Sequence, residues 1–307
     1  MSAGGGTKAV LAALLANTGI ALTKFLAWLL TGSSSMLAEA VHSVADAGNQ
    51  ALLLLGGRRA VRQPTPLHPF GYGRERYIYA FIVSIVLFSV GGLFALYEAW
   101  HKVQDPHAID SWHWVPVLVL LAAIVMESFS LRTAVRESNH VRGRASWVHF
   151  VRRSRSPELP VVLLEDVGAL LGLVFALIGV LLTLVTGDGI WDAAGTAMIG
   201  LLLVAIAVVL ALETKSLLLG ESATPAHTAA IEAALVDGDG VDRIIHMKTM
   251  HLGPDELLVA AKVAVAAAAS AAEIAQAIDA AEVRIREAVP IARVIYLEPD
   301  IFSAVRS

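Results

Sequence analysis

Four ionisable side chains occur inside long apolar stretches of the sequence. His42 and Asp46 lie in one such stretch, and Glu165 and Asp166 lie in another. An ionisable group in the hydrocarbon core of a bilayer costs a few kcal/mol or more, so the default interpretation of such a group is functional. These four side chains are therefore the predicted functional residues.

The spacing of His42 and Asp46 suits the binding of one divalent metal ion. Residues four apart lie on the same face of a helix, about 6 Å apart along its axis, so an imidazole and a carboxylate point in nearly the same direction. Asp166 supplies a third ligand, and either Glu165 or water the fourth, which completes the tetrahedral shell that zinc prefers. The alternative is that these polar side chains form hydrogen bonds between helices and hold a bundle together.

The residue types exclude several other classes of protein. The chain contains no cysteine, which rules out disulfides and thiolate metal sites and disfavours a copper(I) carrier or a zinc ribbon. It contains neither a His-Glu-x-x-His motif nor a Gly-x-Ser-x-Gly motif, which disfavours an intramembrane hydrolase. We expect no enzymatic activity, no bound cofactor and no binding of nucleic acid.

The composition predicts the elements that must position these side chains. Of the 307 residues, 56% are hydrophobic and 16% are charged, and the mean hydropathy is +0.67, whereas about 25% of residues are charged in soluble domains. A polytopic α-helical membrane protein is indicated. Six apolar stretches have the length of about 20 residues that a crossing of the bilayer needs: approximately Val10 to Leu30, Met36 to Gly56, Tyr77 to Trp100, Trp114 to Val135, Pro160 to Thr183 and Ile190 to Leu212.

The distribution of arginine predicts the orientation in the membrane. An even number of crossings puts both termini on one side. The connections after the second and fourth stretches are rich in arginine, whereas the connections on the opposite side contain none, so the positive-inside rule places both termini in the cytoplasm. The arginines concerned are Arg58, Arg59, Arg62, Arg74 and Arg76 in one connection and Arg142, Arg144, Arg152, Arg153 and Arg155 in the other.

Beyond the sixth stretch the sequence changes to mixed polar and apolar patterns. We predict helices at 225–236 and 271–288 and strands at 241–250, 256–265 and 291–298. This α-β-β-α-β order predicts a small α+β domain of the ferredoxin-like type. The predicted organisation is a six-helix transmembrane domain over residues 1–220 and a cytoplasmic domain over residues 221–307. We expect the cytoplasmic domain to mediate dimerisation. The less favoured alternative is a regulatory metal site at its histidines, His227, His246 and His251.

Two segments resemble the cation diffusion facilitator family. Residues 30–50, LTGSSSMLAEAVHSVADAGNQ, resemble the signature of its second helix, and residues 68–76, HPFGYGRER, resemble its following loop. Six crossings and an α-β-β-α-β domain match as well, so the resemblance covers nearly the whole chain. It implies a homodimeric exporter of Zn²⁺ or a neighbouring divalent metal, driven by inward proton flow. It also implies metal ligands four residues apart in helices two and five.

Helix five departs from that pattern. Val162 stands four residues before Asp166 and cannot bind metal, while the neighbouring Glu165 resembles the Glu-Asp pair of a divergent, zinc transporter 9-like branch, similar to the mitochondrial zinc transporter group. One histidine and three carboxylates form a harder shell than two His and two Asp. That shell tilts the preference towards Mn²⁺ or Fe²⁺ relative to Zn²⁺. A non-transporting protein that senses metal or acts as a scaffold is the alternative.

Three further expectations concern the same region. Metal and protons compete for the same ligand atoms, so His42 is the expected site of proton exchange. Lys24 is expected to pair with Glu39, with a built-in cation beside the metal site as the functional alternative. Gly168 and Gly172 form a small-residue face that would let helix two approach Asp166 closely.

Overall fold

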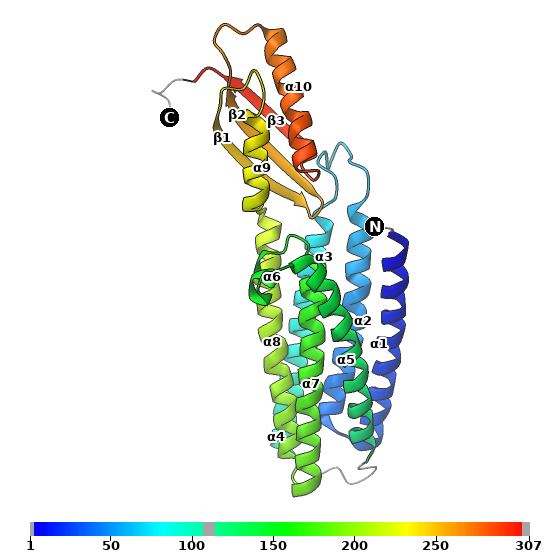
Figure 1. Ribbon diagram of the computed structural model, residues 1–307. Coiled ribbons are helices and arrows are strands. Elements are labelled where there is room, and N and C mark those ends of the chain that lie inside the picture. Colours follow the sequence, from blue (N-terminus) through cyan, green and yellow to red (C-terminus); the bar gives the residue numbers. More distant parts are fainter. Residues whose placement is uncertain (1–2, 107–113, 303–307) are drawn as a thin grey trace. The chain divides into compact units, whose positions relative to one another are not determined.

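The structure, a computed structural model, describes residues 3–106 and 114–302, with side chains from Asn17 onward. Its long helices are α1 (Ala3–Thr31), α2 (Ser34–Ala60), a helix formed by α3 (Glu75–Val86), η1 (Leu87–Leu93) and α4 (Phe94–Gln104), then α5 (Trp114–Arg142), α7 (Glu158–Thr186) and α8 (Ile190–Leu219); a short α6 (Trp147–Arg153) precedes α7 (Figure 1). Each predicted apolar stretch thus lies within a helix.

Four of these helices have the length and hydropathy to cross a bilayer, within the part of the chain that the structure describes: Glu75–Gln104, Trp114–Arg142, Glu158–Thr186 and Ile190–Leu219. The chain is therefore a helical membrane-type protein, as its composition predicts. The crossings by α1 and α2 stay a prediction, and with them the count of six.

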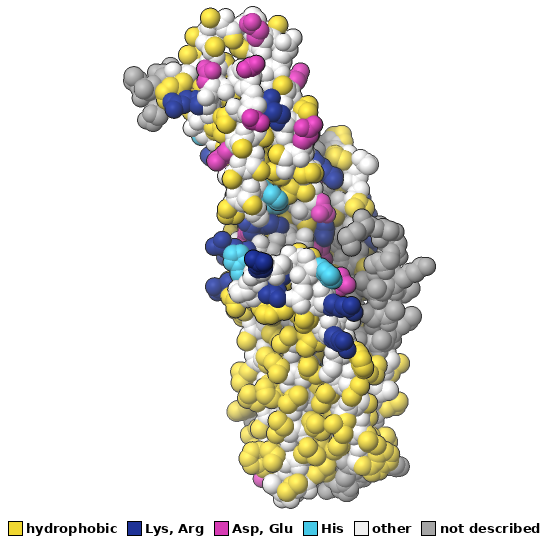
Figure 2. All heavy atoms as spheres, viewed as in Figure 1, with side chains coloured by type: hydrophobic (Ala, Val, Ile, Leu, Met, Phe, Trp, Pro, Cys, Tyr) yellow, Lys and Arg dark blue, Asp and Glu magenta, His cyan; other side chains and the backbone are white. Residues whose placement is uncertain are grey.

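The face of the helical part that Figure 2 shows is predominantly hydrophobic. Exposed leucine, isoleucine, valine and phenylalanine side chains occur along the helices that the structure describes. Lys and Arg side chains border this hydrophobic region in Figure 2, and Arg144, Arg152 and Arg153, in and next to α6, are exposed. An apolar surface bordered by basic residues is suited to contact with lipid and its anionic head groups.

The third long helix contains a π-helical segment, η1. Such segments hydrogen-bond five residues apart and are frequent near functional sites. Two glycines of η1 allow it to pack closely: a Cβ on Gly92 would lie 3.1 Å from the backbone nitrogen of Val204 in α8, and a Cβ on Gly91 would lie 4.0 Å from Nδ1 of His42. The π segment therefore lies directly beside one of the predicted functional residues.

A buried carboxylate from α8 caps the start of α2. Asp192 accepts hydrogen bonds from the backbone N–H groups of Ser34, at 2.8 Å, and Ser35, at 3.3 Å, and from the hydroxyl groups of Ser33 and Ser34. The first N–H groups of a helix have no partner within the helix, and leaving them unpaired in an apolar interior is costly. Asp192 thus fixes the N-terminal end of α2 against α8.

The C-terminal part has the predicted α-β-β-α-β order. It consists of α9 (Pro225–Val236), β1 (Arg243–Gly253), β2 (Glu256–Ala264), α10 (Ala271–Ala288) and β3 (Val294–Asp300). The sheet order is β1-β2-β3, with β1 antiparallel and β3 parallel to β2. The parallel strands pair directly, without the inserted strand of a split β-α-β unit, so the ferredoxin-like assignment stays a prediction.

Local sequence explains the start of α10. Ser270 and Glu273 form a capping box, in which Ser270 Oγ accepts from the backbone N–H of Glu273 and the backbone N–H of Ser270 donates to the Glu273 carboxylate. These hydrogen bonds favour the ionised carboxylate and lower the pKa of Glu273. The cap therefore contributes its full stability above the ordinary pKa of a glutamate and loses it as the pH falls through the lowered value.

The chain divides into two compact units, and the connection between α2 and α3 groups with the C-terminal one. One unit comprises Met1–Arg58 and Arg76–Lys215, the other Arg59–Glu75 and Ser216–Ser307. Within the second unit, a Cβ on Gly73 would lie 2.9 Å from the carbonyl oxygen of Leu252. The domain boundaries predicted from the sequence, 1–220 and 221–307, stay a prediction.

Candidate metal site in the helix bundle

One face of α2 is polar and buried. Glu39, His42, Asp46 and Asn49 have exposed fractions of 0%, 1%, 8% and 0%. Their spacings of three, four and three residues keep successive side chains on one side of the helix. The helix therefore presents a continuous polar stripe to the interior of the bundle.

His42 and Asp46 lie in contact, as their spacing predicts. His42 Nε2 is 3.4 Å from Asp46 Oδ2. Apart from this contact, neither ring nitrogen of His42 has a hydrogen-bond partner among the described residues, and the same holds for Asp46 Oδ1. A buried polar atom without a partner costs about 1–3 kcal/mol, and an ion is one of the accepted explanations for it. The donor atoms suit a divalent cation, and their role as ligands stays a prediction.

The two predicted acidic residues of α7 face the bundle interior. Glu165 and Asp166 are 4% and 7% exposed. Asn49 Nδ2 donates to Glu165 Oε1 at 2.7 Å, and Ser130 Oγ of α5 donates to Asp166 Oδ2 at 3.0 Å. Adjacent residues point about 100° apart around a helix, which explains why Glu165 is turned to α2 and Asp166 to α5.

The carboxylates of α2, α5 and α7 share one electrostatic environment. Asp46 interacts electrostatically with Glu165, Glu127 and Asp166, and Asp166 also interacts with Glu127. Charges of one sign repel each other strongly in a low-dielectric interior. A divalent cation or bound protons would relieve that repulsion. Glu127, 6% exposed on α5, also belongs to this group; as an acidic residue within an apolar stretch, it is interpreted from the sequence as either a gate carboxylate or an interface residue.

These side chains do not form a closed coordination shell. No group of three or more His, Asp or Glu residues is close enough to hold one ion, in the part of the chain that the structure describes. His42 and Asp46 meet, whereas Glu165 and Asp166 are each held by a neutral donor. Each of these hydrogen bonds uses one carboxylate oxygen, Glu165 Oε1 or Asp166 Oδ2, so either side chain can approach the other two with its second oxygen and keep its donor.

The expected pair of Lys24 and Glu39 is present. Lys24 Nζ donates to Glu39 Oε2 at 3.0 Å and to Ser43 Oγ at 2.8 Å. All three groups are buried. An ammonium and a carboxylate that pair within an apolar region partly offset the cost of removing both from water.

The expected role of the two glycines is confirmed for one of them. A Cβ on Gly172 would lie 2.7 Å from Glu39 Oε1, so this glycine does allow α2 to approach α7. A Cβ on Gly168 would instead lie 2.7 Å from Ile206 Cδ1, so Gly168 faces α8.

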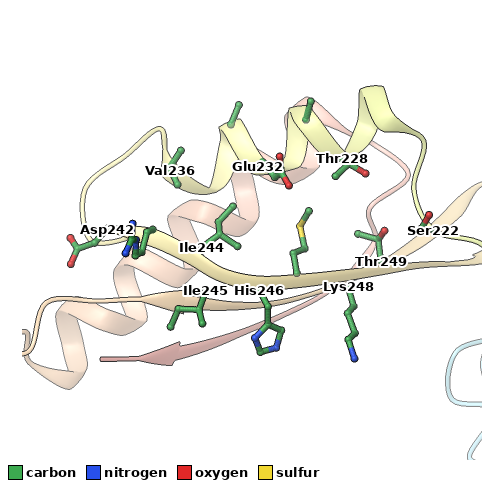
Figure 3. Close-up of a pocket in the computed structure, with 14 residues that line it drawn as sticks. Ser222, Thr228, Glu232, Val236, Asp242, Ile244, Ile245, His246, Lys248 and Thr249 are labelled. Carbon is green, nitrogen blue, oxygen red and sulfur yellow. The ribbon is translucent and has the colours of Figure 1, made fainter. Parts of the chain in front are cut away.

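The C-terminal unit contains a groove between α9 and β1 of about 1170 Å³ (Figure 3). Ile244 and Thr249 lie on the α9 side of β1, whereas His246 and Lys248 lie on its other side.

His251 is buried, and its Nδ1 lies 3.3 Å from the carbonyl oxygen of Gly253. Within the described residues, His246 and His251 join no cluster of three ligands.

The sequence is similar to a family of known proteins. Residues 10–219 match the family model of the cation efflux transmembrane domain. The chain is 34% identical over 248 residues to the human mitochondrial protein named proton-coupled zinc antiporter SLC30A9, covering 80% of this chain and 44% of that protein. The Xenopus laevis protein of the same name is 35% identical over 260 residues, covering 83% and 46%.

A plant relative is more distant. Metal tolerance protein C4 of Arabidopsis thaliana is 27% identical over 253 residues, covering 80% of this chain and 54% of that protein. The chain thus spans about half the length of these relatives. Their names describe antiporters and metal tolerance and not enzymes, in agreement with the sequence-based expectation.

Proposed function

Because the chain belongs to the cation efflux family, in the branch similar to SLC30A9, we propose that it is a secondary transporter that exports a divalent metal cation, with Zn²⁺ as its main substrate, in exchange for protons. One observation carries the proposal above the others. His42 and Asp46 meet on the buried face of α2 with donor atoms that lack partners among the described residues.

The proposed ligands are His42, Asp46 and Asp166, with Glu165 or water completing the shell. His42 and Asp46 form the half of the site that is already assembled. Asn49 and Ser130 hold the two acidic side chains of α7 within the same interior. Neutral donors of this kind orient the ligands of a metal site.

Proton coupling follows from the chemistry of the same atoms. A metal ion requires a neutral imidazole and ionised carboxylates, so each metal ion that binds displaces protons. When the site opens to the other side and releases the metal, protons take its place. A carrier that alternates between these two states exchanges metal for protons.

Helices α1 and α2 and the C-terminal unit complete the proposed assembly. We propose that α1 and α2 also cross the bilayer, which makes six crossings with both termini in the cytoplasm. The α-β-β-α-β unit would then be a ferredoxin-like cytoplasmic domain that pairs with that of a second copy. The Arg-rich segments before α3 and around α6 support this orientation.

One observation favours the alternative of a metal sensor without transport. The described residues form no shell of three ligands, and both acidic residues of α7 already have hydrogen-bond donors. A protein that binds metal through His42 and Asp46 alone could respond to metal without moving it.

Reconstitution into liposomes separates the two functions. We expect the wild-type protein to move Zn²⁺, and Asp46→Ala to reduce that flux at least about 100-fold because a ligand of the transported ion is lost. A zinc-sensitive dye inside the vesicles measures the flux, with a pH-sensitive dye in parallel. Glu137→Gln, which removes an exposed acid of α5, is the matched control.

Each outcome has a defined meaning. Zn²⁺ flux accompanied by proton counter-flow in a fixed ratio supports the antiporter. Zn²⁺ binding that depends on Asp46 without any flux supports the sensor. Flux that survives Asp46→Ala contradicts the proposed site.

A further inference from the structure

The polar stripe of α2 continues past His42 towards the N-terminus of the helix. Glu39 lies three residues earlier, about 4.5 Å along the axis, and only about 20° around the helix from Asp46. Its side chain is completely buried. Three side chains that can bind a cation therefore follow one another along a single helix face.

The two oxygens of Glu39 have different surroundings. Oε2 accepts a hydrogen bond from Lys24, whereas Oε1 has no hydrogen-bond partner among the described residues. Oε1 lies against α7 at Gly172, where any larger side chain would displace it. A buried carboxylate oxygen without a partner is costly, and it is a donor atom that a cation could use.

Lys24 places its side-chain nitrogen at this point, paired with Glu39. Its side chain is completely buried, and its charge acts on His42, Asp46 and Glu127 as well as on Glu39. Attraction and repulsion between charges are only weakly screened in such an interior. The ammonium therefore compensates the carboxylates when no metal is bound, and it opposes the approach of a second cation to Glu39.

We propose that Glu39 is a second cation-binding station beside the site of His42 and Asp46, and that the Lys24 ammonium occupies it between passages of the metal ion. The inference rests on the proposed transport function. In the proposed orientation Glu39 lies on the exit side, so an ion that leaves Asp46 meets Glu39 next and displaces Lys24. Lys24 then returns to Glu39 and hinders re-entry of the ion.

A neutral double variant tests the role of the carboxylate. Lys24→Gln/Glu39→Gln removes both charges of the pair, so no unpaired charge is left in the interior. The full-length protein is assayed for Zn²⁺ flux in liposomes and for Zn²⁺ binding in detergent by equilibrium dialysis. We expect binding within about threefold of the wild type and flux reduced at least about tenfold, which corresponds to a barrier higher by about 1.4 kcal/mol.

A single variant tests the role of Lys24 as a competing cation. Lys24→Gln keeps the carboxylate and removes the ammonium, so we expect Zn²⁺ affinity to rise about tenfold and the variant to bind more Zn²⁺ per protein than the wild type. If the double variant does not fold, Glu39→Asp replaces it, because the shorter side chain withdraws the carboxylate from the station. For this variant we expect Zn²⁺ affinity within about threefold of the wild type and flux at least about tenfold lower.

The controls separate this inference from the proposed function. Wild-type flux in the double variant, or unchanged Zn²⁺ affinity in Lys24→Gln, would identify a purely structural ion pair and overturn the second station. If either of these results is obtained while Asp46→Ala abolishes flux in the same assay, only the second station is contradicted and the proposed transport function stands. If Asp46→Ala transports normally, the proposed function itself fails. Glu137→Gln should match the wild type throughout.

Discussion

His42 differs from an ordinary buried histidine in its surroundings. Buried imidazoles usually donate or accept a hydrogen bond, yet both ring nitrogens of His42 lack such a partner among the described residues. Its neighbour Asp46 has one oxygen in the same condition. The proposed metal site rests on these two adjacent groups and their unused donor atoms.

Asn49 is the residue outside the ligand set with the clearest positioning role. Its amide holds Glu165 at 2.7 Å and turns this carboxylate towards α2. We expect Asn49→Ala to weaken Zn²⁺ binding by about 10- to 100-fold, because partners that orient ligands contribute on this scale. Equilibrium dialysis of the purified protein measures the change.

A second variant tests the corresponding hydrogen bond of the other acidic residue of α7. Ser130→Ala removes the corresponding donor to Asp166 and should also weaken binding, since Asp166 is a proposed ligand. If Asn49→Ala alone leaves affinity unchanged, Glu165 does not contribute to the shell and water takes its place.

The helices are held together by close contacts between their backbones. A Cβ on Gly179 of α7 would lie 2.8 Å from the carbonyl oxygen of Trp191, and a Cβ on Gly195 of α8 would lie 2.9 Å from that of Phe175. Small residues on both sides let α7 and α8 approach each other closely, as is common between membrane helices. This contact lies near Asp192, which holds the start of α2 against α8.

Replacing one of these glycines should loosen the bundle. We expect Gly179→Ala to destabilise the protein by about 1–3 kcal/mol, because the added methyl group would meet a backbone atom that cannot move aside. Thermal unfolding in detergent measures the loss. Gly48→Ala is the matched control, since a Cβ there has no atom within 4 Å; an equal shift in both variants would contradict the packing argument.

The positions of the long helices could be predicted from the sequence because their hydrophobic stretches are long and continuous. Helices extend past the predicted stretches, as α5 does to Arg142, because polar turns continue a helix beyond the hydrocarbon. The pairing of His42 with Asp46 followed from helix periodicity alone. The π segment and the partners of Glu165 and Asp166 depend on packing between distant helices, for which a single sequence carries no local signal.

On the scale of the whole molecule, the chain passes three times between its two units. It does so at Arg58–Arg59, at Glu75–Arg76 and at Lys215–Ser216. Segment 59–75 contacts the rest of the C-terminal unit through Gly73, at Leu252 and Gly253, and through Arg74, whose Nη2 lies 3.2 Å from Met250 Sδ. The sequence did not indicate this grouping, because it joins residues about 180 positions apart.

Cutting the chain after α8 should therefore not release the C-terminal fragment. We expect a specific protease site inserted at Gly220 to yield two fragments that remain associated in detergent, because segment 59–75 stays on the other fragment and keeps its contacts. Size-exclusion chromatography after cleavage measures the association. The variant Gly73→Leu, which places a side chain against the backbone of Leu252, should let the fragments separate; separation without it would contradict the grouping.

The π segment has one more consequence for the helix that contains it. A π turn holds about one residue more than an α turn, so α4 is rotated by about 100° relative to the position that an unbroken continuation of α3 would give it. Rewinding η1 into α form would turn α4 about its own axis and swing Gly91 away from His42. Residues 87–93 therefore determine which side of α4 faces the rest of the helices.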